Sequence, residues 1–196
     1  MVERESPLGP AFEPGAFPNH AGDTGIRLSE ATPARIVEAC AWPGKEQALR
    51  DAIARATGLR LEGTAANSAA SSKDAAALCI GPGRYLVSSA RQGLFETMRA
   101  EIDAETGTVT DLSHGRTCIR LEGSACEWVL SKLFAVDFHL TTFPPGTGLA
   151  TAHHDIFAQI HRSGENRFEI FVFRSFARAF WAALQEAAAE TGYEVR

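Results

Sequence analysis

Three short groups of residues in this sequence carry side chains that could take part in chemistry. His153-His154-Asp155 places two imidazoles beside a carboxylate, and such groups are common metal ligands. Asp111-Leu112-Ser113-His114 holds an acid, a hydroxyl and an imidazole, the functional groups of a hydrolytic triad. Gly81-Pro82-Gly83-Arg84-Tyr85-Leu86 begins like the glycine-rich turn that binds a dinucleotide phosphate. These groups would support three different activities, and their spacing decides among them.

The histidine pair and the glycine-rich turn both lack the geometry of a binding site. Neighbouring residues of a strand point to opposite faces, so His153 and His154 cannot easily reach one ion, and no cluster of cysteines or carboxylates completes a ligand set. In the glycine-rich segment, Leu86 occupies the position of the third glycine, and a strand rather than a helix is expected to follow. We therefore expect a hairpin turn at 81–83, and no metal-binding or cofactor-binding residues in this chain.

The Asp111 group is too local for a catalytic triad, whose members normally come from separated segments. We expect Asp111 to end a strand, and Ser113 and His114 to bond the local backbone in a turn. The sequence also contains neither G-x-S-x-G nor a phosphate-binding loop. No catalytic residue is predicted.

The composition is that of an ordinary globular protein. Hydrophobic residues make up 45% and charged residues 22% of 196, and the net charge of −5 disfavours nucleic acid as a partner. No apolar run reaches the roughly 18 residues that span a membrane, and the charged N-terminus lacks the apolar centre of a secretory signal. We therefore expect a cytoplasmic protein with no membrane partner. The cysteines form no C-x-x-C pair and are interpreted mainly as small hydrophobic residues: Cys40, Cys79, Cys118 and Cys126.

The elements that would position these groups follow a repeated strand–turn–strand–helix pattern. Strand segments alternate with period two, helical segments place apolar residues three and four apart, and Gly58 ends the first predicted helix. Such repeats predict an α+β fold of split β-α-β (ferredoxin-like) units, with helices on one face of a largely antiparallel sheet. Predicted strands lie at 35–42, 75–80, 85–88, 109–112, 117–122, 155–161 and 168–173, with helices around 48–56, 94–102, 126–133 and 176–188.

The same periodicity selects a hydrophobic core. The strand positions share one face by alternation, and the helix positions share one face by helical spacing. Ser89 and Ser175 are the expected caps of the helices that follow them. The positions expected to be largely buried are Ile119, Leu121, Val129, Leu133, Ile170, Val172, Phe176 and Phe180.

The chain is expected to divide into an extended N-terminal arm, residues 1–25, and one α+β domain, residues 26–196. The arm is rich in proline and glycine and carries Leu8, Phe12 and Phe17 as apolar residues that could dock on a partner. A second low-complexity stretch, 63–74, is expected to be a loop.

Arginines and aromatic residues gather in the last predicted hairpin and helix. One interpretation is a core on one side with solvated arginines on the other; the alternative is an interface patch, because both residue types are enriched at interfaces. Arg174 and Arg178 are four residues apart and would share a helix face, which makes them the candidate contact residues. The region also contains Arg162, Arg167, Phe168, Phe171, Phe173, Phe176 and Trp181.

The sequence resembles the sarcosine oxidase gamma-subunit family along nearly its whole length. No single segment is diagnostic, but the segments keep the order and spacing of the family. They include Leu78-Cys-Ile-Gly-Pro82, Val109-Thr-Asp-Leu-Ser-His-Gly-Arg-Thr117, Leu121-Glu-Gly123, Val136-Asp-Phe-His-Leu140, Phe143-Pro-Pro-Gly146 and Arg174-Ser-Phe-Ala-Arg178. Ser6-Pro7-Leu8 and His161-Arg162 agree as well.

The resemblance implies a subunit of a heterotetrameric enzyme that oxidises sarcosine to glycine. It implies alpha, beta and delta subunits as partners, with FAD, FMN, NAD and tetrahydrofolate on partner subunits and no cofactor on this chain. The methylene carbon would pass to tetrahydrofolate or leave as formaldehyde, and oxygen would become hydrogen peroxide. The family resembles the folate-binding domain of aminomethyltransferases, which agrees with the repeated units.

Two other functions remain open from the sequence. The chain could be a free-standing folate-binding or aminomethyltransferase-like protein, in which Asp111 would hold a substrate amine; in a subunit, Asp111 would mark a vestigial site. It could also be a homodimeric binding domain. Folate binding by the isolated chain would favour the first, and co-purification with flavin-bearing chains would favour the subunit.

Overall fold

The computed structural model describes residues 5–61 and 68–196, which form two compact units with an α+β architecture. Unit 1 contains the chain up to Ala31 together with His114–Pro145 and Thr151–Arg196, and unit 2 contains Thr32–Ser113 and Gly146–Ala150. Residues 26–196, expected to be one domain, therefore contribute to both units. Part of the predicted loop at 63–74 lies outside the described residues.

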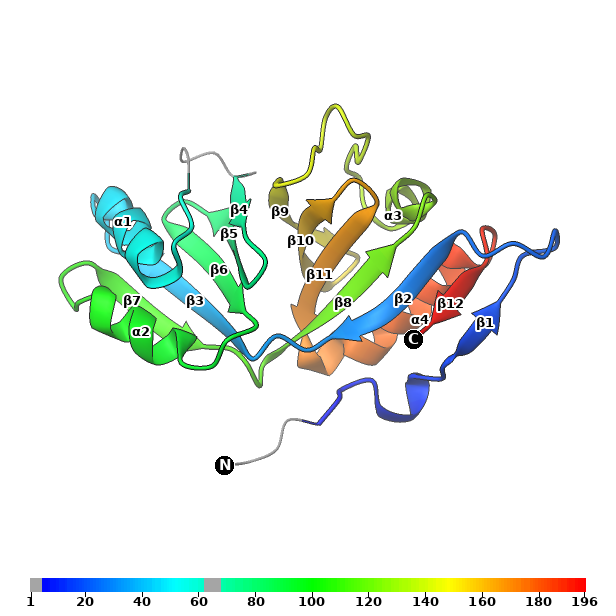
Figure 1. The fold of residues 1–196 in the computed structure, drawn as a ribbon, viewed down its shortest axis with the longest axis horizontal. Helices are drawn as coiled ribbons and strands as arrows, with labels where there is room; N and C mark the ends of the chain where they lie inside the picture. The colour runs from blue at the N-terminus through cyan, green and yellow to red at the C-terminus, as the bar shows by residue number, and fades with distance from the viewer. Residues whose placement is uncertain (1–4, 62–67) are drawn as a thin grey trace. The chain divides into compact units, whose positions relative to one another are not determined.

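Unit 2 is built on a five-stranded antiparallel sheet (Figure 1). Its strands are β3 (Arg35–Ala41), β4 (Ala69–Ser71), β5 (Ala75–Gly81), β6 (Arg84–Ser89) and β7 (Gly107–Asp111). Its helices are α1 (Glu46–Thr57) and α2 (Leu94–Glu101). The strand order β4-β5-β6-β3-β7 places the first strand, β3, between β6 and β7. The succession β3-α1-β5-β6-α2-β7 with this order is the predicted split β-α-β unit.

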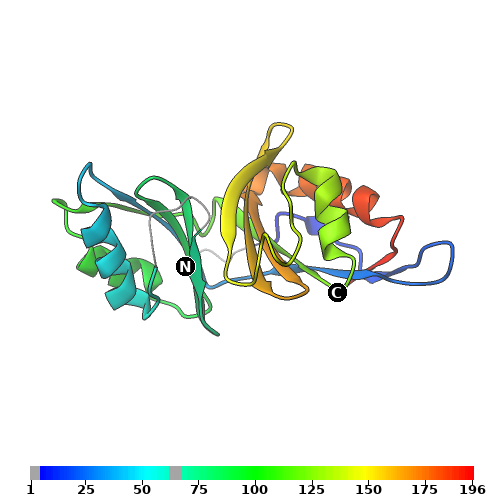
Figure 2. The same cartoon turned by 90° about the horizontal axis from the view of Figure 1, so that it is seen from above.

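The core of unit 2 forms where helix and strand periodicities meet. Leu49 and Ile53 lie one helical turn apart on the buried side of α1, and Val37 and Val87 face them from paired strands. The two helices lie side by side against one face of the sheet (Figure 2). As predicted, α1 ends at Gly58, which adopts the left-handed conformation that glycine tolerates best.

Unit 1 is built on a seven-stranded sheet with order β1-β12-β2-β8-β11-β10-β9. The strands of this sheet are β1 (Gly15–Phe17), β2 (Ile26–Ala31), β8 (Arg116–Glu122), β9 (Gly148–His153), β10 (Ile156–Gly164), β11 (Arg167–Phe173) and β12 (Tyr193–Val195), and of β9 only Thr151–His153 belong to unit 1. Its helices are α3 (Cys126–Leu133) and α4 (Ala177–Ala188), with the short 3-10 helices η1 (Gly9–Ala11) and η2 (Arg174–Phe176).

The succession β8-α3-β10-β11-α4-β12 repeats the split β-α-β unit, with one strand inserted. In unit 2 the last strand pairs with the first, but here β2 lies between β12 and β8 and runs parallel to β12. The register places Ile160, Ile170 and Ile119 opposite one another across three strands, and all three are fully buried. These apolar positions form a core row of unit 1.

The core prediction is confirmed at Ile119, Leu121, Val129, Ile170, Val172 and Phe180, all 0% exposed. It is wrong at Phe176, which is 39% exposed, and Leu133 is only half-buried. The helix was expected to be capped by Ser175, but Arg174–Phe176 forms a 3-10 turn and α4 begins at Ala177. A tighter turn rotates each residue by a different angle, so Phe176 falls off the buried stripe.

Two local expectations are corrected by the strand pairing and the caps. The segments 109–112 and 117–122 do not form a hairpin, because β7 and β8 belong to different sheets. Ser89 does not cap α2: its hydroxyl accepts a hydrogen bond from the Arg91 amide, and Gly93 occupies the cap position. The hairpin turn predicted at 81–83 does connect β5 to β6.

Candidate functional site

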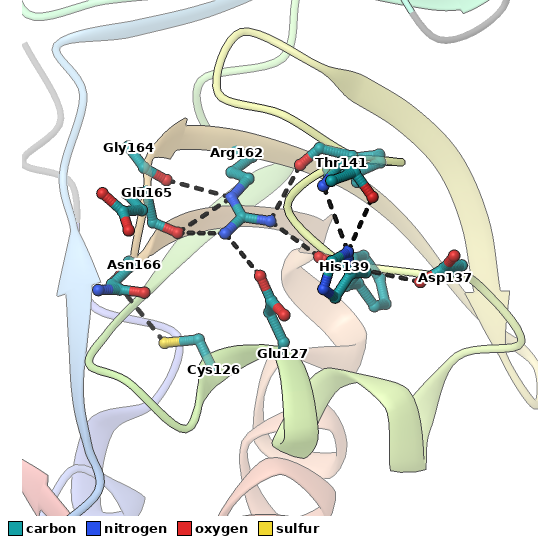
Figure 3. A network of polar contacts seen from close by, with 11 residues as sticks. Cys126, Glu127, Asp137, His139, Thr141, Arg162, Gly164, Glu165 and Asn166 are labelled. Carbon is teal, nitrogen blue, oxygen red and sulfur yellow. Dashed lines mark hydrogen bonds and ion pairs between the residues drawn. The ribbon is translucent and has the colours of Figure 1, made fainter.

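The most extensive polar cluster of unit 1 is centred on Arg162 of β10. Its side chain is almost completely buried, 1% exposed, and its guanidinium is bonded on every nitrogen (Figure 3). Nη1 donates to the carbonyls of Phe138 at 2.8 Å and Phe143 at 3.0 Å, while Nη2 donates to the Glu127 carboxylate at 2.7 Å and to the Glu165 carbonyl. Nε donates to Glu165 at 3.1 Å. A buried charge needs this degree of pairing to be tolerated.

This cluster is a structural clamp rather than a binding site. A guanidinium has five N–H donors, and the Arg162 bonds to carbonyls and one carboxylate occupy them. Glu127, from α3, is its ion-pair partner. The cation also lies 4.9 Å from the centre of the Phe168 ring, a favourable cation–π distance. No donor of Arg162 is therefore left to receive a ligand.

The clamp fixes the segment that connects α3 to β9. Phe138 and Phe143, whose carbonyls Arg162 bonds, are buried, and their rings pack together at 5.4 Å. Phe138 also packs edge-on against Phe168 at 5.8 Å. Between these two anchored residues, Leu140 is 37% exposed. Arg162 thus holds an otherwise irregular segment in one conformation by its backbone.

A second charged cluster lies on β8, β10 and β11. Arg120 donates to Glu169 at 2.7 Å, and the buried imidazole of His161 lies 3.8 Å from the other oxygen of that carboxylate. Burial raises the pKa of Glu169, while His161 and Arg120 lower it by more, so this pKa lies below its usual value. Glu169 is therefore held as a carboxylate by its neighbours.

Asp111, the candidate vestigial site, ends β7 and is exposed. Its carboxylate accepts a hydrogen bond from the Ser113 amide at 2.9 Å. The Ser113 hydroxyl accepts one from the Ile36 amide at 3.0 Å. The Asp111 carboxylate thus takes part in the turn that ends the strand, but the expectation that Ser113 bonds the local backbone is wrong, because its hydroxyl bonds Ile36 on the neighbouring strand β3. Its role in turnover stays a prediction.

The candidate interface residues of the arm take part in contacts within unit 1. Leu8 is completely buried, and the Phe12 ring lies 5.7 Å from that of Trp181 on α4. Phe17 stacks on Tyr193 at 4.8 Å, because β1 pairs with β12 at the edge of the sheet. Leu8 is unavailable to a partner while this packing holds, whereas Phe17 remains 37% exposed.

The arginine-rich region separates into a buried part and an exposed part. Arg162, Phe168, Phe171 and Trp181, which the sequence placed in a candidate surface patch, are at most 1% exposed and belong to the core. Their positions on the sheet and on α4 face inward. The exposed part consists of Phe173 and Phe176, each 39% exposed, together with Arg167 and Arg178, while Arg174 is half-buried.

Arg174 and Arg178 do not share a helix face, because α4 begins after Arg174. Arg178 is exposed and its Nε donates to the Pro7 carbonyl at 3.1 Å, so it also holds the arm. Arg167 pairs with Glu122 at 3.3 Å. Of Arg167, Arg174 and Arg178, only Arg174 has a side chain that makes no hydrogen bond or ion pair with the residues that the structure describes.

The surface of unit 2 carries shallow depressions. One of about 420 Å³ is lined by Phe95, Arg99, Asp103 and Val109, and one of about 280 Å³ by Thr57, Asp74, Ser89 and Arg91. The Arg91–Asp74 ion pair, at 2.5 Å, crosses the second. Within 5–61 and 68–196, no three His, Cys, Asp or Glu side chains gather to hold a metal ion. No helix in this part of the chain is long and apolar enough to cross a membrane.

Sequence reasoning missed the role of Arg162, although a signal for it was present. Ala158, Ile160 and Arg162 occupy alternate positions of β10 and therefore share the face that packs in the core. An arginine on an apolar face, followed by Gly164 at a hairpin, predicts a buried cation bonded to backbone carbonyls. The partner loop at 138–143 could not have been identified, because its carbonyls carry no side-chain signature.

Comparisons with known proteins agree over most of the chain. Residues 44–190 match the "Sarcosine oxidase, gamma subunit family". A sarcosine oxidase subunit gamma from Corynebacterium sp. (strain U-96) is 29% identical over 157 residues, which cover 80% of this chain and 76% of that protein. A sarcosine oxidase subunit gamma from an Arthrobacter species is 30% identical over 168 residues, covering 85% and 81%.

Two solved structures share the fold. A chain of the heterotetrameric sarcosine oxidase from Corynebacterium sp. U-96, in complex with pyrrole 2-carboxylate, has a TM-score of 0.80 and 28% identity over 96% of both chains. An aminomethyltransferase T of the glycine cleavage system from Bartonella henselae has a TM-score of 0.61 at 17% identity, covering 88% of this chain and 48% of that one. The second likeness extends to the fold alone.

Proposed function

Because the chain belongs to the sarcosine oxidase gamma subunit family, we propose that it is the assembly subunit of a heterotetrameric sarcosine oxidase. Its contribution to the enzyme is to bind and shape the larger chains rather than to carry out a chemical step. The proposal extends to this chain what the names of its relatives state of them.

The observation that supports the proposal is that the main polar side chains of this chain bond to other groups of the same chain. Arg162 spends its donors on backbone carbonyls and Glu127, and Glu169 is held by Arg120. Asp111 accepts the bond that ends its strand. A catalytic or cofactor site needs polar groups that converge on an open cavity, whereas these groups converge on the chain itself.

The cofactors and partners of the proposed complex follow from the family resemblance. FAD, FMN, NAD and tetrahydrofolate are assigned to the alpha, beta and delta subunits. The complex would demethylate sarcosine to glycine in the cytoplasm, with hydrogen peroxide and methylenetetrahydrofolate, or formaldehyde, as products. This chain would be active in that reaction only as part of the assembly.

The test is co-expression of this chain with the alpha, beta and delta subunits of the proposed enzyme, followed by size-exclusion chromatography. We expect it to elute with the flavin-bearing chains, and sarcosine-dependent peroxide formation to fall when it is omitted. If the chain elutes alone and its omission leaves activity unchanged, the proposed function is wrong.

A second candidate, a folate-binding or aminomethyltransferase-like protein, is favoured only by the fold. Isothermal titration of the isolated chain with tetrahydrofolate distinguishes the two candidates, because the folate-binding protein would bind it and the assembly subunit would not. Asp111→Asn in the assembled enzyme should leave sarcosine turnover near normal if the chain is an assembly subunit. A loss of several orders of magnitude with assembly intact would favour the transferase instead.

A further inference from the structure

The turn between β11 and α4 exposes two phenylalanines that the rest of unit 1 leaves uncovered. Phe173 is the last residue of β11 and Phe176 the last residue of η2, and each is 39% exposed. Other aromatic residues nearby, such as Phe171 and Phe180, are at most 1% exposed. Two neighbouring aromatic rings left in water are unfavourable unless something covers them.

The same turn is cationic. The Arg116 guanidinium lies 3.5 Å from the centre of the Phe173 ring and covers one side of it. Arg174 stands between the two phenylalanines, and no carboxylate within 5–61 or 68–196 comes within ion-pair distance of it. Arg174 thus brings a positive charge to this turn, on a chain whose net charge is −5. Arginine beside exposed aromatic rings is the composition of the energetic centre of a protein interface.

The turn is also held rigidly, which lowers the entropic cost of binding. The Arg174 amide donates to the Gly115 carbonyl at 3.0 Å, and the 3-10 turn passes directly into α4. Both neighbouring elements are anchored in the core through Val172 and Ala177, each 0% exposed. A surface held in its bound conformation loses little freedom on association.

We propose that Phe173, Arg174 and Phe176 form a docking patch for an acidic and apolar segment of a larger subunit in the same enzyme. This inference rests on the proposed function and narrows it to one surface. The partner's carboxylate would pair with Arg174, and its apolar side chains would cover the two rings. The charge of Arg174 favours an acidic occupant, because a second copy docking through the same patch would bring Arg174 against Arg174.

The test uses the co-expressed enzyme with an affinity tag on this chain, and compares two patch variants with one control. Arg174→Glu reverses the charge, and Phe176→Ser removes an exposed ring. Arg99→Glu is the matched control: Arg99 is an exposed arginine 5.7 Å from the Phe95 ring, in unit 2. Retention of the large subunits is measured over a series of salt concentrations.

We expect both patch variants to bind the large subunits about tenfold or more weakly, and the Arg99→Glu variant to bind like the wild type. The wild-type association should weaken with salt, and the Arg174→Glu variant should have lost part of that dependence. Wild-type retention by both patch variants overturns the docking patch while the proposed function stands. Failure of the wild-type chain to retain the large subunits overturns the proposed function itself.

Discussion

At the scale of single residues, Arg162 is a buried cation on which the fold of unit 1 depends. Replacing it with methionine keeps most of its volume but leaves the Glu127 carboxylate and the carbonyls of Phe138 and Phe143 without their donor. The two buried carbonyls left without their donor cost about 1–3 kcal/mol each, and Glu127, whose side chain is 34% exposed, adds less than a fully buried partner would. We therefore expect Arg162→Met to lower the free energy of unfolding by about 2–6 kcal/mol in chemical denaturation.

The control for Arg162→Met is Arg167→Met, five positions along the chain. Arg167 is 47% exposed and pairs with Glu122 at 3.3 Å, and exposed pairs contribute at most about 1 kcal/mol. Equal losses of stability in the two variants would show that the Arg162 clamp is unimportant.

The Glu169 carboxylate predicts how stability depends on pH. Its pKa is lowered in the folded protein, because His161 and Arg120 outweigh the effect of burial. A lowered carboxyl pKa contributes stability above the pKa of the unfolded chain, and that contribution disappears as the pH falls through the folded pKa. We expect Glu169→Gln to be less stable than the wild type at neutral pH. The difference between their free energies of unfolding should narrow as the pH falls below the pKa of an ordinary glutamate.

The measurement is denaturant unfolding of both proteins across a pH series, with Glu165→Gln as control. Glu165 is exposed and contributes its backbone carbonyl, not its carboxylate, to the Arg162 clamp. Glu165→Gln should leave the dependence of the free energy of unfolding on acidic pH unchanged. A Glu169→Gln variant with the wild-type slope would contradict the assignment.

At the scale of elements, the start of α4 is decided by one turn of 3-10 helix. Phe180 lies in the core at 0% exposed, while Phe176 is 39% exposed just before the helix. Phe180→Ala should therefore cost roughly 3–5 kcal/mol, and Phe176→Ala less than about 1 kcal/mol. Thermal unfolding of the two variants checks the difference. Similar shifts in both would mean that the helix register is wrong.

The N-terminal arm is the second element whose role the contacts redefine. Its sequence indicated an extended segment whose apolar residues could dock on a partner, but Leu8 is 0% exposed and Phe12 packs against the buried Trp181. Leu8→Ala should cost about 2–5 kcal/mol as a buried truncation. Phe17→Ala, at a residue 37% exposed, should cost much less. Unfolding curves of the isolated chain measure both losses of stability. A Leu8→Ala variant as stable as the wild type would show that the arm does not contribute to the stability of the fold.

The elements that the sequence predicted well are those whose partners are close along the chain. The hairpins β5–β6 and β10–β11 and helix α1 follow from local alternation, turn residues and helical spacing. The strand β2 was missed although Ile26 and Leu28 alternate, because its partners β8 and β12 lie far along the chain. Strands of three residues, such as β12, carry too few positions for a period to be detected.

At the scale of the whole molecule, local patterns could not show which strands share a sheet. The segments that became β7 and β8 are separated by a short polar stretch typical of a hairpin, yet the chain passes there from unit 2 to unit 1. Sheet membership depends on pairing between distant segments, such as β3 with β7. The same limit applies to the Arg162 clamp, whose acceptors are backbone carbonyls of a segment about twenty residues away.

The whole molecule, purified alone, offers no turn of the kind that usually binds a cofactor phosphate among the residues that the structure describes. A flavin or nicotinamide phosphate is usually bound by a glycine-rich turn that leads into the N-terminus of a helix. Here the turn at Gly81–Gly83 joins β5 directly to β6, so it offers no helix terminus to a phosphate. The buried cation of Arg162 is bonded to the chain itself. We therefore expect the isolated chain to be colourless and free of stoichiometric metal, and visible absorbance to appear only in fractions that contain the larger subunits.

The measurement is a visible spectrum and an elemental analysis of the chain expressed alone, compared with those of the assembled enzyme. Flavin bound one-to-one to the isolated chain would contradict a role limited to assembly.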